Sequence, residues 1–310
     1  MIDHVAHELA AARLHYGHGT DNPRDEAAWL VGNALQISPQ DLAKHLRDRP
    51  NATEIEGIRA LVEERIQTRK PLAYLLNEAW FAGRRFYVDE RVLVPRSLTA
   101  EFIAERFQPW IAPHAVRRAL DLCTGSGCIA IALAHAFPGA RVDATDLSTD
   151  ALAVARINIE RHGLHDRVRL IHADLFKGIP RKRYDLIVTN PPYVGAREMR
   201  TLPREYRHEP AAALQSGQSG LDAVVSILAH AADHLTPHGI LVAEVGNSAP
   251  LLARRFPSVP FVWLETASGD SSVFLLTAVQ LGEHHDAFEA AWRRSGTKRR
   301  AAPGKRRGTA

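Results

Sequence analysis

The chain has 310 residues, of which 45% are hydrophobic, and a formal net charge of +4. This composition is typical of a globular protein, and the length allows about two domains. No stretch approaches the roughly 18 apolar residues that a membrane-spanning helix needs, and the N-terminus lacks the basic start and apolar core of a signal peptide. We therefore expect a cytoplasmic protein with no membrane segment. Two cysteines are too few to supply a structural zinc site, so we expect no metal.

Residues 1–75 are predicted to form a small helical domain. Asn22-Pro23 predicts the start of a helix, because proline is favoured at the first helical position. Ser38-x-x-Asp41 and Thr53-x-x-Glu56 have the pattern of capping boxes, which predicts that the next two helices begin there. We expect this domain to recognise the substrate.

Residues 76–96 are predicted to form a β-hairpin linker, because Trp80 to Val94 alternates in polarity, with Asp89-Glu90 near the turn. From 97 to 282 strands and helices alternate, which predicts an α/β domain with a mostly parallel sheet covered on both faces. The last strands are expected at Phe261 to Glu265 and Ser272 to Ala278.

The basic charge of the chain is concentrated at its end. Trp292 to Ala310 contains eight basic residues and no acidic one, so the rest has 31 basic and 35 acidic residues and a net charge of −4. For residues 283–310 we expect a helix and then a basic, disordered tail, which cannot bury enough surface to fold alone. A solvated terminus and a non-specific attraction to RNA explain the tail equally well.

A motif that suits amide chemistry, Asn190-Pro191-Pro192-Tyr193, directly follows Tyr184–Thr189, an apolar run with the composition of a strand. In an open α/β sheet, ligands bind at the carboxyl ends of the strands. An amide nitrogen is a poor nucleophile because its lone pair is delocalised, so transfer to it requires accurate aim. The Asn190 side chain and the Pro191 carbonyl can accept both hydrogens of an NH2 group, and Tyr193 can pack on its plane. The alternative interpretation is a turn that ends the strand.

A second motif lies upstream. Arg118–Leu122 is predicted to be a strand, Cys123–Cys128 a small-residue loop and Ile129–Phe137 a helix. Glycine allows a ligand to approach the backbone closely, and Asp146, after the strand Ala140–Thr145, is well placed for a ribose diol. This pattern also fits a dinucleotide site, but the motif at Asn190 belongs to methyl transfer and not to hydride transfer.

Asp121 to Gly127, Asp146 and Asn190 to Tyr193 resemble the S-adenosylmethionine-dependent class I methyltransferases that modify amino or amide nitrogens. The segments Ala79–Gly83, Phe86–Ser97, Tyr206–Pro210 and Ser219–Asp222 resemble the HemK-type protein-(glutamine-N5) methyltransferase family. Within it, Trp80-Phe81 and Val94-Pro95-Arg96-Ser97 are most similar to the branch that methylates a glutamine of large ribosomal subunit protein three. Leu98 departs from the proline that is common there.

The resemblance implies a Rossmann-like class I methyltransferase fold, S-adenosylmethionine as the cofactor, and roles for particular residues. Asp146 is expected to accept the ribose hydroxyls, and Asp174 to accept from the adenine amino group. No catalytic base is required, because the amide can lose its proton after methylation. The expected catalytic residues are Asn190, Pro191, Pro192 and Tyr193; the cofactor-binding residues are Asp121, Cys123, Thr124, Gly125, Ser126, Gly127, Asp146, Asp174, Leu175 and Asn190; the substrate-binding residues are Arg96, Asn190, Tyr193 and Glu209.

The function that the resemblance implies is methylation of a glutamine side-chain amide on a large-subunit ribosomal protein, with that protein, free or on an assembling subunit, as the partner. The alternatives are glutamine methylation of peptide release factors, methylation of an adenine amino group on nucleic acid, and a cofactor-binding assembly factor without activity. The long segment Val194 to Gly220 is interpreted as a partly ordered lid over the substrate, because long connections are usually functional or disordered.

Overall fold

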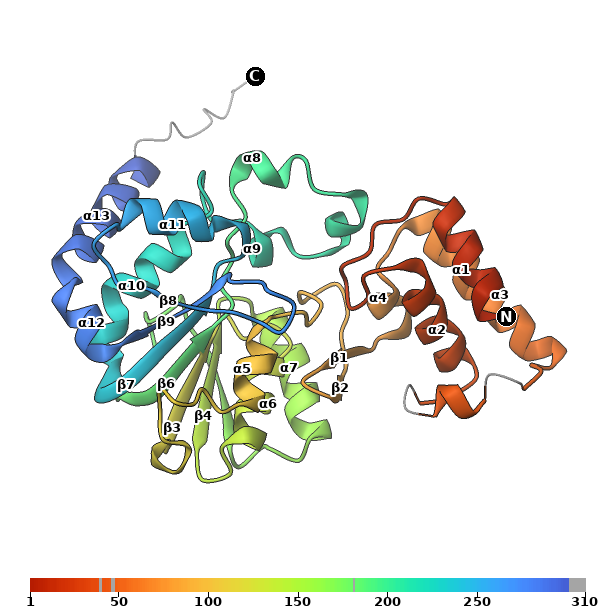
Figure 1. Ribbon diagram of the computed structural model, residues 1–310, viewed down its shortest axis with the longest axis horizontal. Helices are drawn as coiled ribbons and strands as arrows, with labels where there is room; N and C mark the ends of the chain where they lie inside the picture. Colours follow the sequence, from red (N-terminus) through yellow and green to blue (C-terminus); the bar gives the residue numbers. More distant parts are fainter. Residues whose placement is uncertain (39–40, 46–47, 181, 301–310) are drawn as a thin grey trace, which may run out of the picture.

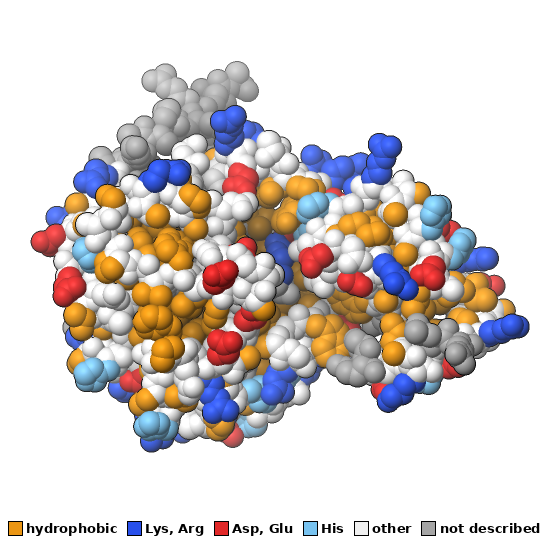
Figure 2. All heavy atoms as spheres, viewed as in Figure 1, with side chains coloured by type: hydrophobic (Ala, Val, Ile, Leu, Met, Phe, Trp, Pro, Cys, Tyr) orange, Lys and Arg blue, Asp and Glu red, His pale blue; other side chains and the backbone are white. Residues whose placement is uncertain are grey.

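The computed structural model describes residues 1–300 except 39–40, 46–47 and 181, and describes side chains as far as Ser295. The end of the predicted basic tail, residues 301–310, lies outside the described residues. A group of helices at the N-terminus stands beside a larger α/β part, and a small hairpin lies between them (Figure 1). On the face seen in Figure 2, the surface is hollowed between these two parts. No helix of the described chain is both long and apolar enough to cross a bilayer.

The α/β part is built on a seven-stranded sheet in the order β5-β4-β3-β6-β7-β9-β8. Only β9 runs antiparallel to its neighbours, so the predicted mostly parallel sheet is confirmed. The strands are β3 (Arg118–Leu122), β4 (Arg141–Asp146), β5 (Val168–His172), β6 (Tyr184–Thr189), β7 (Leu235–Glu244), β8 (Val262–Leu264) and β9 (Val273–Thr277).

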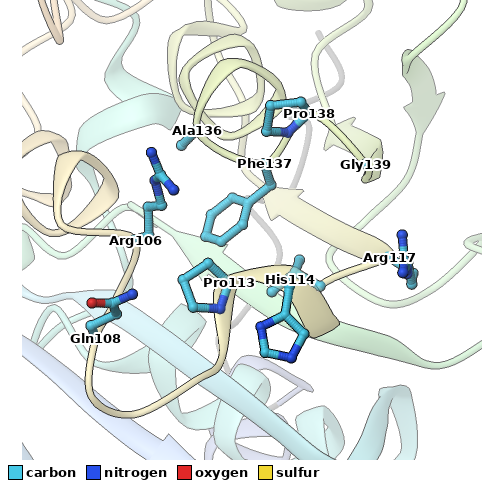
Figure 3. Close-up of a pocket in the computed structure, with 10 residues that line it drawn as sticks. Arg106, Gln108, Pro113, His114, Arg117, Ala136, Phe137, Pro138 and Gly139 are labelled. Carbon is cyan, nitrogen blue, oxygen red and sulfur yellow. The ribbon is translucent and has the colours of Figure 1, made fainter.

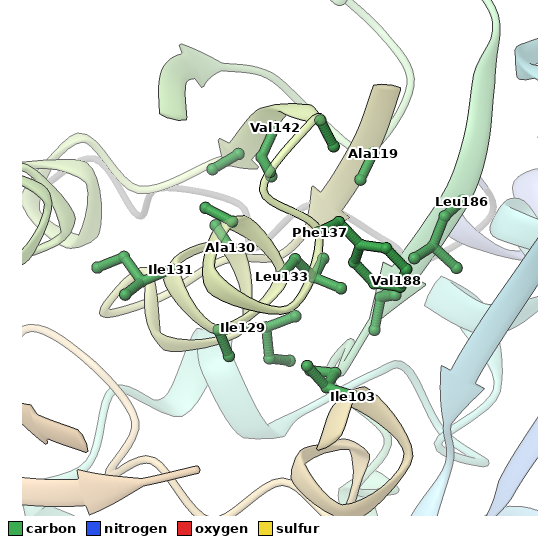
Figure 4. Close-up of a cluster of buried hydrophobic side chains, with 14 of the residues drawn as sticks. Ile103, Ala119, Ile129, Ala130, Ile131, Leu133, Phe137, Val142, Leu186 and Val188 are labelled. Atoms are coloured by element: carbon green, nitrogen blue, oxygen red, sulfur yellow. The ribbon is translucent and has the colours of Figure 1, made fainter. Parts of the chain in front are cut away.

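Helices cover both faces of this sheet, as the buried runs of the strands require. The first face carries α5 (Thr99–Ala104), α6 (Cys128–Ala136) and α7 (Thr149–Arg161), and the second carries α10 (Asp222–His234), α12 (Ala278–Glu283) and α13 (His285–Arg300), with α11 (Ala249–Arg255) beside them. The strand β3 shows the division, because Ala119 packs in the core under α6 whereas Leu120 and Leu122 pack in the core under α10. Figure 4 shows Leu133 and Phe137 lying against the side chains of Ala119, Leu186 and Val188. The helix α6 is apolar except for His135 and is buried from Cys128 to Ala134, because it packs between the sheet and neighbouring helices.

The N-terminal helices are α1 (Ile2–Ala11), α2 (Pro23–Ala34), α3 (Ala52–Thr68) and α4 (Leu72–Leu76), with a short 3-10 helix at Leu42–Lys44. Asn22 caps α2 as predicted, by accepting from the N–H groups of Arg24 and Asp25. The two predicted capping boxes are wrong. The box of α3 is formed by Asn51 and Glu54, two residues earlier than expected. The Ser38 hydroxyl accepts from the Asp41 N–H and donates to the Asp41 carboxylate in a turn before the 3-10 helix.

Gly57 in the exposed part of α3 offers a test of this helix. A Cβ added there would meet no atom within 4 Å. We expect Gly57→Ala to raise the free energy of unfolding by about 0.5–1 kcal/mol, because alanine loses less backbone entropy in a helix. Urea denaturation measures the change. Gly83→Ala is the matched control, since Gly83 has equal space but a φ of +70° and should lose stability on substitution.

The hairpin between the two parts consists of β1 (Ala79–Phe81) and β2 (Arg84–Phe86). Its turn lies at Ala82-Gly83, where both φ angles are positive, as a tight two-residue hairpin requires. The predicted hairpin turn at Asp89-Glu90 is therefore wrong. A turn closed by the Val92 N–H and the Asp89 carbonyl at 3.1 Å does lie there, but it comes after the hairpin. Asp89 also accepts hydrogen bonds from the Tyr87 hydroxyl and the Arg91 backbone, and the apolar residues before and after this turn pack inward. They form one core with α4 and α7, made of Ala73, Tyr74, Ala79, Val88, Val92, Val94, Ala151 and Val154.

The segment Val194 to Gly220 contains α8 (Ala196–Met199), a 3-10 helix at Arg204–His208 and α9 (Ala211–Leu214). It reaches from the sheet toward the N-terminal helices (Figure 1). The Glu205 carboxylate accepts from the His15 backbone N–H at 3.0 Å and pairs with Arg69 at 2.7 Å. The segment therefore ties the N-terminal helices to the α/β part, and its role as a lid stays a prediction.

Candidate active site at the carboxyl edge of the sheet

The strand order reverses between β3 and β6. The chain passes outward through β3, β4 and β5 and then returns to the other side of β3 as β6. At such a point the loops after the two central strands diverge and leave a crevice for a ligand. The loops that diverge here are Cys123–Gly127 and Asn190–Tyr193, so the fold brings the two predicted motifs to one edge. The Thr189 hydroxyl donates to the Leu122 carbonyl at 2.9 Å and joins the ends of both strands.

The glycine loop after β3 is held open by Asp121. Its Oδ2 accepts from the Thr124 hydroxyl at 2.6 Å and from the Ala130 N–H at 2.9 Å, which also caps the first turn of α6. Burial raises the pKa of the Asp121 carboxyl to about 7, although these two hydrogen bonds oppose the shift. A Cβ added at Gly125 would meet no atom within 4 Å. The backbone is therefore bare toward the crevice, as close approach of a ligand requires.

A residue that the motifs did not single out fixes the other side of this loop. The side chain of Asn158, on α7, donates to the carbonyls of Ser126 and Tyr87 at 2.8 and 2.9 Å, and its oxygen accepts from the Tyr87 N–H. Asn158 thereby connects the glycine loop with the segment after the hairpin. Sequence patterns could not reveal it, because an asparagine in a helix carries no motif of its own.

Asp146 ends β4 beside the glycine loop. Its two oxygens accept from the N–H groups of Gly125 and Ser148 at 2.9 and 2.8 Å, and burial raises the pKa of its carboxyl. The next residue, Leu147, is 64% exposed at this edge, and no motif in the sequence marks it. The Ala173 N–H donates to the Asp146 carbonyl at 3.0 Å, so Asp174 and Leu175 follow at the same edge, where Leu175 has a φ of +52°.

The amide-binding motif follows β6. The Asn190 side-chain oxygen is buried and has no hydrogen-bond partner among the described residues. An unpaired buried acceptor is costly, which indicates that a ligand donor belongs there. Asp121 Oδ1 is a second such atom. The Asp121 oxygen, the bare glycine loop, the carboxylate of Asp146 and the exposed Leu147 fit a cofactor with an amino group, a ribose and an apolar ring.

Tyr193 of this motif is fixed on several sides. Its hydroxyl donates to Glu244 Oε1 at 3.2 Å, and its carbonyl accepts from the Ser248 hydroxyl at 2.9 Å. A Cβ added at Gly246 would lie 2.5 Å from the Tyr193 ring, so the turn after β7 packs directly on the ring. Glu244 was not among the residues predicted for the site. Its sequence pattern resembles that of Asp121, because both are acidic residues near the end of a buried strand and a glycine follows closely.

Gly246→Ala is expected to disturb this packing strongly. The residue has a φ of +47°, and the added methyl group would overlap the ring of Tyr193. Because a displacement of about 1 Å near the reacting groups can cost about 10²-fold in rate, we expect a loss of that order in methyl transfer. The measurement is the turnover rate of the purified variant. Gly282→Ala, with no atom within 4 Å of the added group, is the control and should turn over normally.

Two predicted substrate-binding residues are bonded to each other. The Arg96 guanidinium contacts both oxygens of Glu209, at 2.5 and 2.7 Å, and its charged end lies 5.4 Å from the centre of the Tyr206 ring. Burial alone would raise the pKa of the Glu209 carboxyl, but Arg96 and His18 together outweigh burial and lower this pKa to about 2. His18 Nε2 lies 3.5 Å from Glu209. The structure thus shows a junction of linker, segment and N-terminal helices, and binding of substrate by Arg96 and Glu209 stays a prediction.

A cavity of about 500 Å³ lies elsewhere, lined by residues before β3 and after α6, at the amino edge of the sheet (Figure 3). Figure 3 shows Arg106, His114 and Phe137 around it. None of the predicted site residues lines this cavity. Within the described part of the chain, no three His, Cys, Asp or Glu side chains lie close enough together to hold a metal ion.

The chain matches two family models. The model described as the PrmC N-terminal domain matches residues 6–76, and the one described as the Methyltransferase small domain matches residues 99–218. Among solved structures, a methyltransferase from Pyrococcus furiosus is 21% identical, with a TM-score of 0.45, and the match covers 61% of this chain and 87% of that chain.

Relatives of similar length are much closer in sequence. The ribosomal protein uL3 glutamine methyltransferase of Neisseria meningitidis serogroup B is 50% identical over 271 residues, which cover 87% of this chain and 89% of that protein. The protein of the same name from Burkholderia pseudomallei is 46% identical over 289 residues, which cover 91% of this chain and 94% of that protein. The predicted branch is confirmed: the chain is an S-adenosylmethionine-dependent methyltransferase and belongs to the family of the ribosomal protein uL3 glutamine methyltransferases.

Proposed function

We propose that this enzyme methylates the side-chain amide nitrogen of a glutamine in ribosomal protein uL3. The observation that carries the proposal is the buried, unpaired oxygen of Asn190 at the strand reversal. A glutamine NH2 group is a donor of matching geometry. The names of the relatives from Neisseria and Burkholderia support the choice of substrate protein.

The residues around the crevice divide the task. Asn190 and the Pro191 carbonyl accept the two hydrogens of the NH2 group, and Tyr193 supports the plane of the amide, with Pro192 keeping the backbone rigid between them. S-adenosylmethionine supplies an electrophilic methyl group with a good leaving group. The cofactor-binding residues are those of the loop after β3, with Asp146, Asp174, Leu175 and Asn190. Catalysis is then mainly a matter of positioning, for which effective molarities of roughly 10⁵–10⁸ M have been measured in model reactions.

We further propose a division of the chain into a substrate-recognition domain (1–75), a linker (76–96), a catalytic domain (97–282) and a C-terminal extension (283–310). The contacts of Glu205 and Glu209 with residues of the N-terminal part support this division. Through these contacts, a protein bound to the N-terminal part would be held at a fixed position relative to the crevice. The proposed site of action is the cytoplasm, on free uL3 or on an assembling particle. Attraction of the basic tail to RNA stays a prediction.

The test is transfer of labelled methyl groups from S-adenosylmethionine to three acceptors in parallel: unmethylated uL3, an unmethylated peptide release factor and duplex DNA. Label on uL3 alone is the expected result. Label mainly on the release factor would mean that the enzyme methylates glutamine but that its substrate is a release factor. Label on DNA alone would mean that the methylated NH2 group belongs to adenine. Tight association with ribosomal particles without any transfer would instead indicate an assembly factor.

A further inference from the structure

Glu244, the last residue of β7, connects the motif Asn190–Tyr193 with the end of the linker, two segments that lie far apart in the sequence. Its side chain is buried, with 4% of the residue exposed. Oε1 accepts from the Tyr193 hydroxyl at 3.2 Å, whereas Oε2 accepts from the Ser97 hydroxyl at 2.6 Å and from the Leu98 N–H at 3.0 Å. One carboxylate therefore joins the amide-binding motif to the end of the linker.

The other contacts of Tyr193 leave its hydroxyl to Glu244. Gly246 packs on the face of the ring, and Ser248 holds the backbone carbonyl. Among the described residues, Glu244 is the hydrogen-bond partner of the hydroxyl. Burial raises the pKa of the Tyr193 hydroxyl, so this group keeps its proton and donates a hydrogen bond to the carboxylate. Glu244 therefore holds the hydroxyl end of the ring, while Gly246 contacts its face and Ser248 holds the backbone of Tyr193.

We propose that Glu244 is a positioning residue of the reaction, which fixes the Tyr193 ring against the plane of the substrate amide and anchors Ser97 and Leu98 with its other oxygen. This inference rests on the proposed function of Tyr193. The hydrogen-bond geometry requires two acceptor oxygens, because Ser97 and Leu98 donate to one oxygen and the Tyr193 hydroxyl donates to the other. An amide in place of the carboxylate cannot accept from the donors on both of its sides.

The experiment is a double-mutant cycle with Glu244→Gln and Tyr193→Phe. Each single substitution is expected to lower kcat by about 10- to 100-fold, since small misplacements of reacting groups have effects of this order. The affinity for S-adenosylmethionine and the KM for the protein substrate should change little. The double variant should be no slower than the slower single variant, because both substitutions remove the same contact. Ser97→Ala removes the hydroxyl contacts with Glu244 Oε2 and with Thr99 but leaves the Tyr193 contact with Oε1 in place, so it should cost less than Glu244→Gln.

The control is Glu283→Gln, which changes an exposed glutamate at the end of α12 and should leave kcat unchanged. Urea denaturation of all variants establishes that each is folded at the assay temperature. Losses that multiply in the double variant, or a loss in affinity for the cofactor as large as the loss in kcat, would overturn the role of Glu244. A wild-type enzyme that transfers no methyl group to glutamine would instead overturn the proposed function, so the two failures are distinct.

Discussion

Asn190→Ala is expected to lower the rate of methyl transfer by about 10²–10³-fold, which is the usual effect of losing one preorganised polar contact in an active site. The side-chain oxygen of Asn190 is buried at the strand reversal and has no partner among the described residues. Its removal leaves one hydrogen of the substrate NH2 group without an acceptor, so the plane of the amide is held by the Pro191 carbonyl alone. Binding of S-adenosylmethionine should remain largely intact, because the glycine loop and Asp146 are untouched. Single-turnover kinetics and calorimetric titration of the cofactor measure the two effects.

Asn247→Ala is the matched control for this variant. Its side chain is exposed, contacts Glu198 at 3.3 Å and follows the next strand of the same sheet. Normal turnover is expected for it. Unchanged turnover in Asn190→Ala would contradict the proposed role, and so would a cofactor affinity that falls as far as the rate.

Glu209→Gln is expected to lower the free energy of unfolding by about 3 kcal/mol at neutral pH. Removing one partner of a buried ion pair usually costs about 3–5 kcal/mol, and the value should lie at the lower end because the Arg96 side chain is 21% exposed. The substitution leaves the guanidinium without a countercharge beside His18. Urea denaturation measures the loss.

The pH dependence of this loss provides a second check. The folded-state pKa of Glu209 is lowered to about 2 from 4.5, so its ionised form stabilises the protein above the unfolded-state pKa. The difference between wild type and variant should be constant near neutral pH and shrink as the pH falls from about 4.5 toward 2. Glu289→Gln, which breaks an exposed pair with Arg293, should cost under about 1 kcal/mol. Equal losses of unfolding free energy in Glu209→Gln and Glu289→Gln would contradict a stabilising role for the buried pair of Arg96 and Glu209.

The sheet and its ligand edge could be predicted from sequence because the signals are local. The strands β3 and β6 begin and end where the apolar runs do, and a motif at the end of a parallel strand must lie at the carboxyl edge. The residues Asp121 and Asn190 were thereby placed together although about seventy positions separate them. Each of these predictions needs only the period of a strand and the geometry of a parallel sheet.

The features that were missed depend on contacts between distant segments. The hairpin turn at Ala82-Gly83 lacks the asparagine or aspartate that usually marks such a turn, and the fold imposes a positive φ on Ala82. Likewise, nothing in the sequence links Arg96 with Glu209, or Ser97 with Glu244. Their pairing follows from the way in which the segment Val194 to Gly220 and the end of β7 meet the linker.

The position of the transferred methyl group shows whether the enzyme acts on a glutamine amide. Unmethylated uL3 is incubated with the enzyme and S-adenosylmethionine, and the modified residue is located by peptide fragmentation in a mass spectrometer. Acid hydrolysis of the labelled protein then separates an amide-bound methyl group, which is released as methylamine, from one bound to carbon or to a lysine. We predict that uL3 carries one methyl group on a glutamine and that this group is recovered as methylamine. A methyl group on any other residue of uL3 would contradict it.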